Sequence, residues 1–178
     1  MQERVWEGPR MSKGPAIRCY NYVNRPYEEV RRALTKDALA IFQTATRAAA
    51  SRARSLAAEL RTGVGAISLE AEIVISVKQV EEKPAEAMSD PLTRLHLEWQ
   101  AVKMPALFPF MQAELSIYPL TSTETQLDFS GVYEPPLGPL GKALNAVALH
   151  RIAESSVHRF VADVAEYLRQ SLPSAAAT

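Results

Sequence analysis

The feature that most constrains the fold is a series of alternating strands followed by one long helix. Apolar side chains occupy the odd positions of residues 67–77, and most even positions are polar. The same period of two recurs in residues 95–101, 111–117 and 125–133. This period indicates strands with one buried and one solvent-facing side, whereas a helix would place Glu70 and Glu72 among the apolar residues. Four such strands with short connections predict an antiparallel meander.

A turn rich in proline and glycine follows the last strand, at Tyr133-Glu134-Pro135-Pro136-Leu137-Gly138-Pro139-Leu140-Gly141, and opens a helical stretch that reaches Leu172. An apolar sheet face left in water would forfeit about 25 cal/mol for each Å². This helix is the only long element that the pattern offers as a cover. We therefore predict an α+β fold in which a curved antiparallel sheet wraps around a long C-terminal helix and leaves a cavity. The apolar stripe of the helix comprises Ala153, Val157, Phe160, Val161, Val164 and Leu168.

The N-terminal part predicts a strand followed by two short helices. Residues 16–23 are β-rich, and Asn24-Arg25-Pro26 stops them. Helical spacing follows in residues 27–34, and an alanine-rich stretch in residues 37–50 favours a second helix. Apolar residues recur at every second position of residues 56–60, and we interpret this stretch as a short strand. The total strand count, six or seven, stays open. Residues 81–91 are charged and contain proline, which predicts a loop.

Length and charge limit the classes of partner. The chain has 178 residues, and we expect a single domain at 15–172, with a flexible leader at 1–14 and a flexible tail at 173–178. Lysine plus arginine and aspartate plus glutamate number 20 each, which argues against nucleic acid as the main partner. A lone cysteine, Cys19, fits a reducing, cytoplasmic location. We expect no integral membrane segment, since no apolar run approaches the roughly 18 residues of a span. The sequence leaves open whether the chain forms a homodimer.

The order of elements resembles the helix-grip fold of the SRPBCC superfamily, which is START/Bet v 1-like and includes polyketide cyclase-like proteins. Residues 22–30, Tyr22-Val23-Asn24-Arg25-Pro26-Tyr27-Glu28-Glu29-Val30, are similar to that family's entry from strand to helix, and residues 133–141 resemble its turn into the gripping helix. Arg151-Ile152-Ala153-Glu154 and Phe160 resemble the helix itself. The resemblance covers residues 16–170. It implies a cavity for an apolar or amphipathic small molecule, such as a lipid, sterol or polyketide, and no catalytic residue is carried over from it.

The inward-facing phase of the predicted sheet supplies the candidate ligand-binding residues. Each of them is also compatible with an ordinary core. Trp99 and Tyr133 stand out because each joins an apolar ring to a polar group that needs a partner when buried, so they are candidates for orienting a ligand. The candidate binding set is Ile73, Ile75, Leu97, Trp99, Met111, Leu115, Phe129, Tyr133, His150 and Val157.

The titratable residues offer little catalytic chemistry. His150 lies near the apolar stripe of the helix and could serve as a general base or a donor, and Tyr133 is the other candidate for proton transfer. His96 falls on the polar phase, where we expect it to be solvated, and His158 falls outside the stripe. The three histidines lack a metal-ligand spacing, so we expect neither a metal nor a cofactor. The strand carboxylates fall on the outer phase, which favours binding over catalysis.

Three hypotheses follow for the function. The first is binding of a hydrophobic or amphipathic small molecule, lipid- or polyketide-like, between the sheet and the C-terminal helix. The second is a polyketide cyclase or dehydratase that uses the same cavity. The third is a protein-interaction module with a closed core, in which the arginine-rich residues 47–61 contact a partner.

Overall fold

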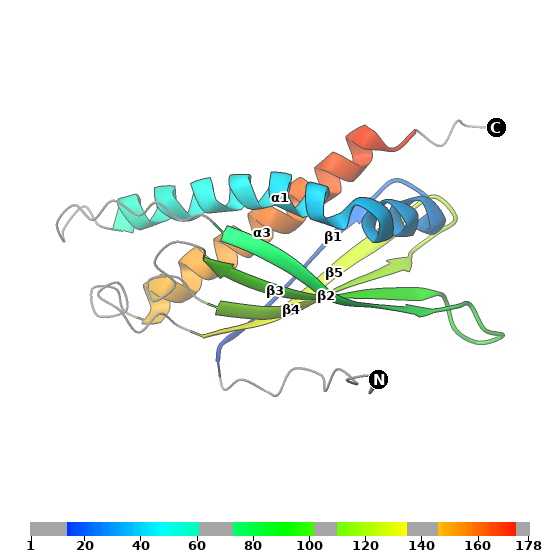
Figure 1. Ribbon diagram of the computed structural model, residues 1–178, viewed down its shortest axis with the longest axis horizontal. Helices are drawn as coiled ribbons and strands as arrows, with labels where there is room; N and C mark the ends of the chain where they lie inside the picture. The colour runs from blue at the N-terminus through cyan, green and yellow to red at the C-terminus, as the bar shows by residue number, and fades with distance from the viewer. Residues whose placement is uncertain (1–13, 61–72, 102–109, 135–145, 174–178) are drawn as a thin grey trace, which may run out of the picture.

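The computed structural model describes residues 14–60, 73–101, 110–134 and 146–173 (Figure 1). Within these ranges, five strands form one antiparallel sheet in the order β1-β5-β4-β3-β2. Because β2 to β5 are neighbours in chain order, the predicted meander is confirmed, and β1 joins it beside β5. The elements are β1 (Ala16–Val23), α1 (Tyr27–Leu60), β2 (Ile73–Lys83), β3 (Leu92–Ala101), β4 (Phe110–Pro119), β5 (Thr125–Glu134) and α3 (Ala146–Ser171).

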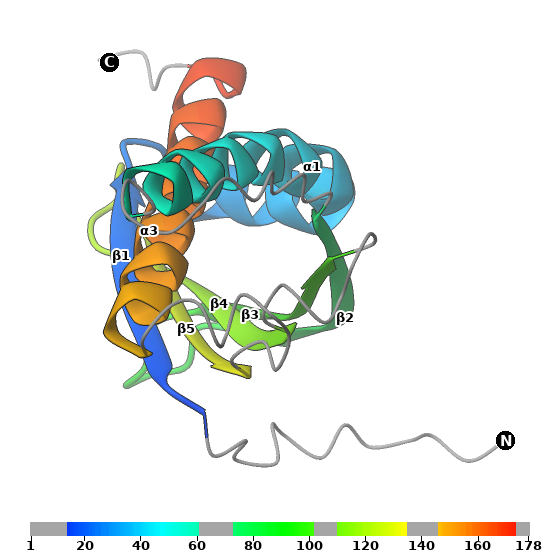
Figure 2. The same ribbon diagram turned by 90° about the vertical axis from the view of Figure 1, so that its left-hand side faces the viewer.

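Both helices cover the same face of the sheet, which curves beneath them (Figure 2). The predicted apolar stripe of α3 is buried, from Ala153 to Leu168. α3 packs on β1 and α1, and α1 packs on α3 and β2. The helix-grip arrangement is therefore confirmed. Our view of the C-terminal helix as the only long cover was wrong, because α1 forms half of the helical layer.

α1 consists of two helices that meet at a kink, as the two predicted helices do, although the second is longer than the sequence indicates. It spans 34 residues and is kinked at Asp37, whose backbone (φ −121°, ψ 23°) leaves the helical region. The kink falls where the sequence predicts the second helix to begin. The interpretation of residues 56–60 as a strand was wrong, since the helix continues to Leu60. An alternation of only five residues is too short to outweigh the helix propensity of alanine, leucine and glutamate.

β2 extends further along the chain than predicted. It runs to Lys83, into the stretch that we expected to be a loop, while residues 67–72 of the predicted strand lie outside the described ranges. Pairing with β3 explains the extension, with Glu81 opposite Arg94 and Lys83 opposite Leu92. The register shifts between Val77 and Gln79, which is a β-bulge and increases the local twist.

Arg25 fixes the C-terminal end of α3. Its guanidinium donates to the carbonyl oxygen of Arg169 (2.6 Å) and to that of Leu172 (3.1 Å). Arg169 in turn donates to the carbonyl oxygen of Tyr22 (2.8 Å). The last carbonyls of a helix have no intrahelical partner, and a cation there also opposes the helix dipole. The segment between β1 and α1 therefore holds the far end of the chain in place.

Candidate ligand-binding site

Four inward-facing residues, one from each of β2, β3, β4 and β5, form a row across the sheet. The row lies close to the C-terminal end of β5. Register pairs Ile75 with Trp99, Trp99 with Met111, and Met111 with Tyr133. Their exposed fractions are 4%, 7%, 4% and 2% in that order. Alternation places all four on the side of the helices, as the sequence predicts. The row therefore joins two rings with polar groups, Trp99 and Tyr133, through a flexible methionine.

His150 of α3 meets the Tyr133 end of this row. The Tyr133 hydroxyl oxygen lies 3.2 Å from His150 Nδ1, within hydrogen-bonding distance. The two rings are nearly parallel, with an interplanar angle of 23° and centroids 6.0 Å apart. Tyr133 is buried, whereas His150 is half-buried. The structure thus brings together the two residues that the sequence offers for proton transfer.

The protonation of this pair determines what it can do. Burial raises the pKa of the Tyr133 phenol, so the hydroxyl keeps its proton at neutral pH. When Tyr133 donates to Nδ1, the neutral His150 ring carries its proton on Nε2. When Nδ1–H donates to the phenol oxygen, the phenol proton is free for another acceptor. The group that can still donate to a third molecule is therefore Nε2–H of His150 in the first arrangement and the Tyr133 hydroxyl in the second.

The centre of the interior is a packed aromatic cluster around Phe160 of α3. The Phe160 ring centroid lies 5.2 Å from that of Trp99, 5.7 Å from that of Phe42 and 6.2 Å from that of Phe129. These are ordinary distances for tilted and edge-on aromatic pairs. Phe129 therefore belongs to the core, and Trp99 is shared between the core and the row that ends at Tyr133.

The other predicted lining residues are distributed through the core. The side chain of Ile73 lies outside the described part. The buried ones are Leu97, Leu115, Phe129 and Val157, which are at most 4% exposed.

Sequence reasoning missed a second polar contact in the interior. The Tyr27 hydroxyl of α1 lies 2.7 Å from Thr93 Oγ1 of β3, and both residues are buried. Thr93 has the inward phase of Leu95 and Leu97, but the predicted strand began too late to include it. Phe42 was also missed, because nothing in an alanine-rich helix shows which residue reaches the centre. The Tyr27–Thr93 contact lies at the opposite end of β3 from Trp99.

The prediction that His96 is solvated was wrong. We expected it to be solvated, yet it is 3% exposed, although it faces the outer side of the sheet. Its Nε2 lies 3.3 Å from a Glu81 carboxylate oxygen, and its Nδ1 lies 4.0 Å from one of Glu114. Side chains from the strands on both sides cover it. His158 is exposed, as its position outside the apolar stripe predicts.

The remaining chemically reactive groups do not enter the site. Burial, and secondarily Asp128, raise the pKa of the Cys19 thiol to about 12, so it stays protonated. Arg25 caps α3, and Arg151 is exposed. Among the described residues, no group of three or more histidine, cysteine or acidic side chains is placed to hold a metal. In those same ranges, no helix is long and apolar enough to cross a membrane.

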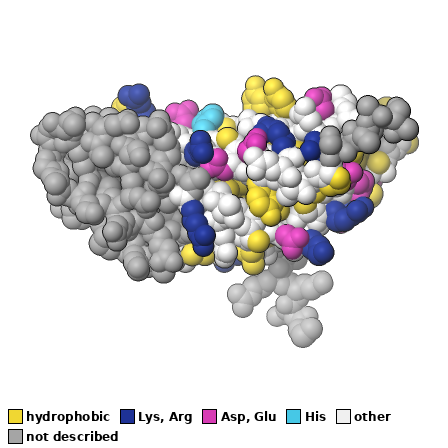
Figure 3. Space-filling view, turned by 90° about the horizontal axis from the view of Figure 1, so that it is seen from above, with side chains coloured by type: hydrophobic (Ala, Val, Ile, Leu, Met, Phe, Trp, Pro, Cys, Tyr) yellow, Lys and Arg dark blue, Asp and Glu magenta, His cyan; other side chains and the backbone are white. Residues whose placement is uncertain are grey.

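The described part of the surface on the helix side has neither a purely basic nor a purely acidic patch. Lysine and arginine side chains are interspersed there with acidic ones (Figure 3). Among the described side chains, nothing in the charge distribution of this face favours a polyanionic partner.

An open antiparallel sheet that curves around a C-terminal helix is the helix-grip arrangement that the resemblance to the SRPBCC superfamily implies. Solved structures with this fold are similar to the chain. The Zhui aromatase/cyclase from a Streptomyces species is 12% identical, with a TM-score of 0.48 over 92% of this chain and 99% of that one. A hypothetical protein from Helicobacter pylori is 10% identical, with a TM-score of 0.47 over 95% and 98%.

Norcoclaurine synthase from Thalictrum flavum is 11% identical, with a TM-score of 0.44 over 94% of this chain and 95% of that one. No protein-family model matches the chain. No curated protein matches it either. At these identities and TM-scores the likeness carries no argument about function, which has to be argued from the residues of the site.

Proposed function

We propose that the protein binds an apolar or amphipathic small molecule against the inner face of the sheet, with the polar end of the ligand at Tyr133 and His150. The observation that carries the proposal is the hydrogen-bonded Tyr133–His150 pair, set beside an otherwise apolar row. Small-molecule sites are mostly apolar, with a few polar groups that fix orientation. The pair supplies those groups, and Ile75, Trp99 and Met111 supply the apolar surface.

Tryptophan fluorescence gives a direct test, because the chain has two tryptophans, Trp6 and Trp99. In a Trp6→Phe background, Trp99 reports alone on the inner face. Anilinonaphthalene sulfonate serves as an amphipathic probe, and we expect energy transfer from Trp99 to the bound dye. Binding without any transfer from Trp99 would place the dye elsewhere and count against the site.

Matched substitutions test the polar end. Tyr133→Phe keeps the ring and removes one hydrogen-bonding group, which is worth about 0.5–1.5 kcal/mol and so weakens probe binding about two- to tenfold. Tyr167→Phe is the control, since Tyr167 lies on α3 and is 38% exposed. Equal probe affinities of Tyr133→Phe and Tyr167→Phe would show that the Tyr133 hydroxyl does not contact the probe.

The Tyr133–His150 contact also favours a second candidate function. A phenol and an imidazole in contact can move a proton, so the same site would suit a cyclase or dehydratase acting on a polyketide-like substrate. That function predicts that His150→Gln abolishes turnover while the protein stays folded, and that His158→Gln leaves turnover unchanged. Turnover that survives His150→Gln would exclude His150 as the proton-transfer group.

Native mass spectrometry of the purified protein, followed by solvent extraction, separates these functions from a closed core. A co-purified apolar molecule near one per chain supports the binding function and identifies the chemical class of the ligand. A mass without ligand, combined with no transfer from Trp99 to the dye, would contradict the proposal and favour a protein-interaction module.

A further inference from the structure

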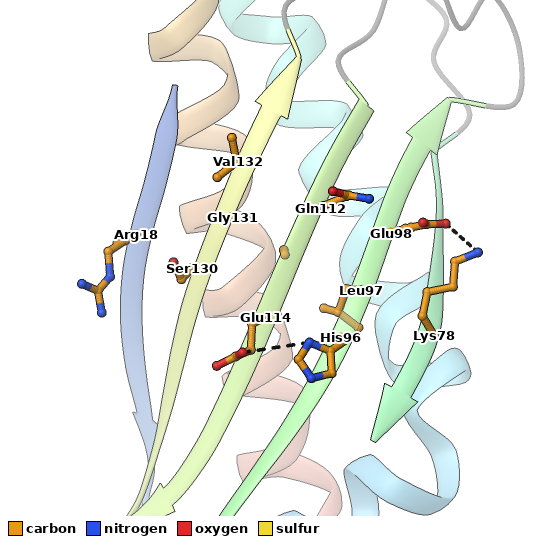
Figure 4. A pocket seen from close by; sticks show the side chains of 11 residues that line it. Arg18, Lys78, His96, Leu97, Glu98, Gln112, Glu114, Ser130, Gly131 and Val132 are labelled. Atoms are coloured by element: carbon orange, nitrogen blue, oxygen red, sulfur yellow. Dashed lines mark ion pairs between the residues drawn. The ribbon is translucent and has the colours of Figure 1, made fainter. Parts of the chain in front are cut away.

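The outer face of the sheet, which points away from both helices, carries a hollow of about 400 Å³ (Figure 4). This volume lies in the range of small-molecule sites. Two rows of outward-facing residues flank the hollow. One row runs through Glu98, Gln112 and Val132, and the other through His96, Glu114, Ser130 and Arg18.

The floor of the hollow is mainly backbone. Leu97, Ala113 and Gly131 lie in the row between the two flanking rows, and their side-chain positions face the inner side. A Cβ on Gly131 would lie 3.0 Å from a ring carbon of Phe129 and 3.2 Å from the sulfur of Met111, which confirms this orientation. The hollow and the inner face are therefore separate surfaces with one layer of sheet between them.

The two carboxylates of the hollow are engaged by neighbouring side chains before any ligand binds. Lys78 of β2 reaches Glu98 of β3 (2.5 Å), and His96 and Glu114 point toward each other from β3 and β4 (Figure 4). Glu114 also accepts a hydrogen bond from Ser116 (2.7 Å) and lies 3.4 Å from Arg94 Nε. Groups fixed in this way lose little entropy on binding, which favours affinity.

The lining has no net sign of charge. Arg18 and Lys78 oppose Glu98 and Glu114, so neither a polyanion nor a polycation is complementary to it. Donors and acceptors instead alternate along the hollow, and Gln112 and Ser130 each supply both. A ligand whose groups both donate and accept, as hydroxyls do, can satisfy such a lining throughout.

An exposed aromatic ring follows Arg18, the lining residue of β1, on the same strand. Tyr20 lies two residues from Arg18 on the same outward phase and is 69% exposed. Asp128 of β5 lies 3.8 Å from the Arg18 guanidinium and is the register partner of Tyr20. An aromatic face offers apolar contact to the C–H side of a polyhydroxylated ring.

We propose that this hollow is a binding site for a short saccharide, with the sugar hydroxyls on Glu98, Gln112, Glu114 and Ser130 and one sugar ring against Tyr20. The site is independent of the inner face. Its ligand is neutral and rich in hydroxyls, whereas the ligand proposed for the inner face is mainly apolar.

Nuclear magnetic resonance of the ¹⁵N-labelled full chain tests the proposal, with maltose and cellobiose as probes and glycylglycine as a zwitterionic comparison. We expect a sugar to shift the backbone amides of Gln112, Ser130 and Gly131. Ser130→Trp fills the hollow from an exposed position, so we expect it to abolish these shifts, whereas Ser122→Trp in the exposed β4–β5 turn should retain them.

Tyr20→Ala should weaken sugar binding about fivefold, the size of one aromatic contact. Three results would overturn the proposal: neither sugar shifts these amides, the shifts persist in Ser130→Trp, or glycylglycine shifts them where the sugars do not. Binding of anilinonaphthalene sulfonate, followed by direct excitation of the dye, should be unchanged in Ser130→Trp, which separates this site from the inner one.

Discussion

Replacing Phe160 by alanine tests whether the centre of the grip is a packed core. Phe160 is fully buried and contacts the rings of Phe42, Trp99 and Phe129. Removing a fully buried phenylalanine side chain costs about 1.5–3 kcal/mol in transfer free energy. The residual cavity and the lost ring contacts raise the expected cost to about 3–5 kcal/mol.

Urea denaturation followed by Trp99 fluorescence in the Trp6→Phe background measures this free energy of unfolding. Tyr167→Ala on the same helix is the control, and we expect it to cost less than about 1 kcal/mol because the ring is partly exposed. If Phe160→Ala cost no more than this control, the aromatic cluster would not be a core. The proposed ligand site would then extend into the centre of the molecule, beyond the row that ends at Tyr133.

Three further predictions concern the ends of the elements and the buried thiol. Arg25→Ala should lower the free energy of unfolding by about 2 kcal/mol, because it leaves two helix-terminal carbonyls without their charged donor; urea denaturation checks this against Arg32→Ala, an exposed arginine of α1, and equal effects would contradict the capping role. Gly14→Val should displace the start of β1, since a Cβ on Gly14 would clash with the Tyr133 carbonyl oxygen, and unchanged amide shifts around Tyr133 would show that the contact is absent. The raised pKa of Cys19 means that the folded state holds the thiol proton more tightly than the unfolded state, so its stabilising contribution is complete below a pH of about 9 and is lost as the pH rises toward about 12; unfolding measured across this range should therefore depend less on pH in Cys19→Ala, and identical profiles would count against the burial of the thiol.

Local periodicity was enough to predict the inner face of the sheet. A period of two assigns Trp99, Met111 and Tyr133 to one side without any knowledge of the neighbouring strands, and the structure places all three there. The apolar stripe of α3 followed from a period of 3.6 in the same way. Both predictions succeed because the direction of a side chain depends on the backbone of its own element.

Contacts between elements required the tertiary structure. His96 has the phase of a solvent-facing residue, and only Glu81 and Glu114 on the flanking strands bury it. The outer hollow likewise depends on which residues of different strands become register partners.

The Tyr133–His150 contact shows most clearly what the sequence determined and what required the tertiary structure. The sequence by itself determined that one residue belongs to the inward phase of a strand and the other to the helix that covers it. Their separation of 3.2 Å depends on where α3 crosses the sheet. That crossing is decided by the packing of Phe160 among three other rings and by Arg25 at the end of the helix, which are contacts between residues distant in the chain. Such contacts leave no periodic trace in the sequence, because each element satisfies its own hydrogen bonds whichever partner it meets.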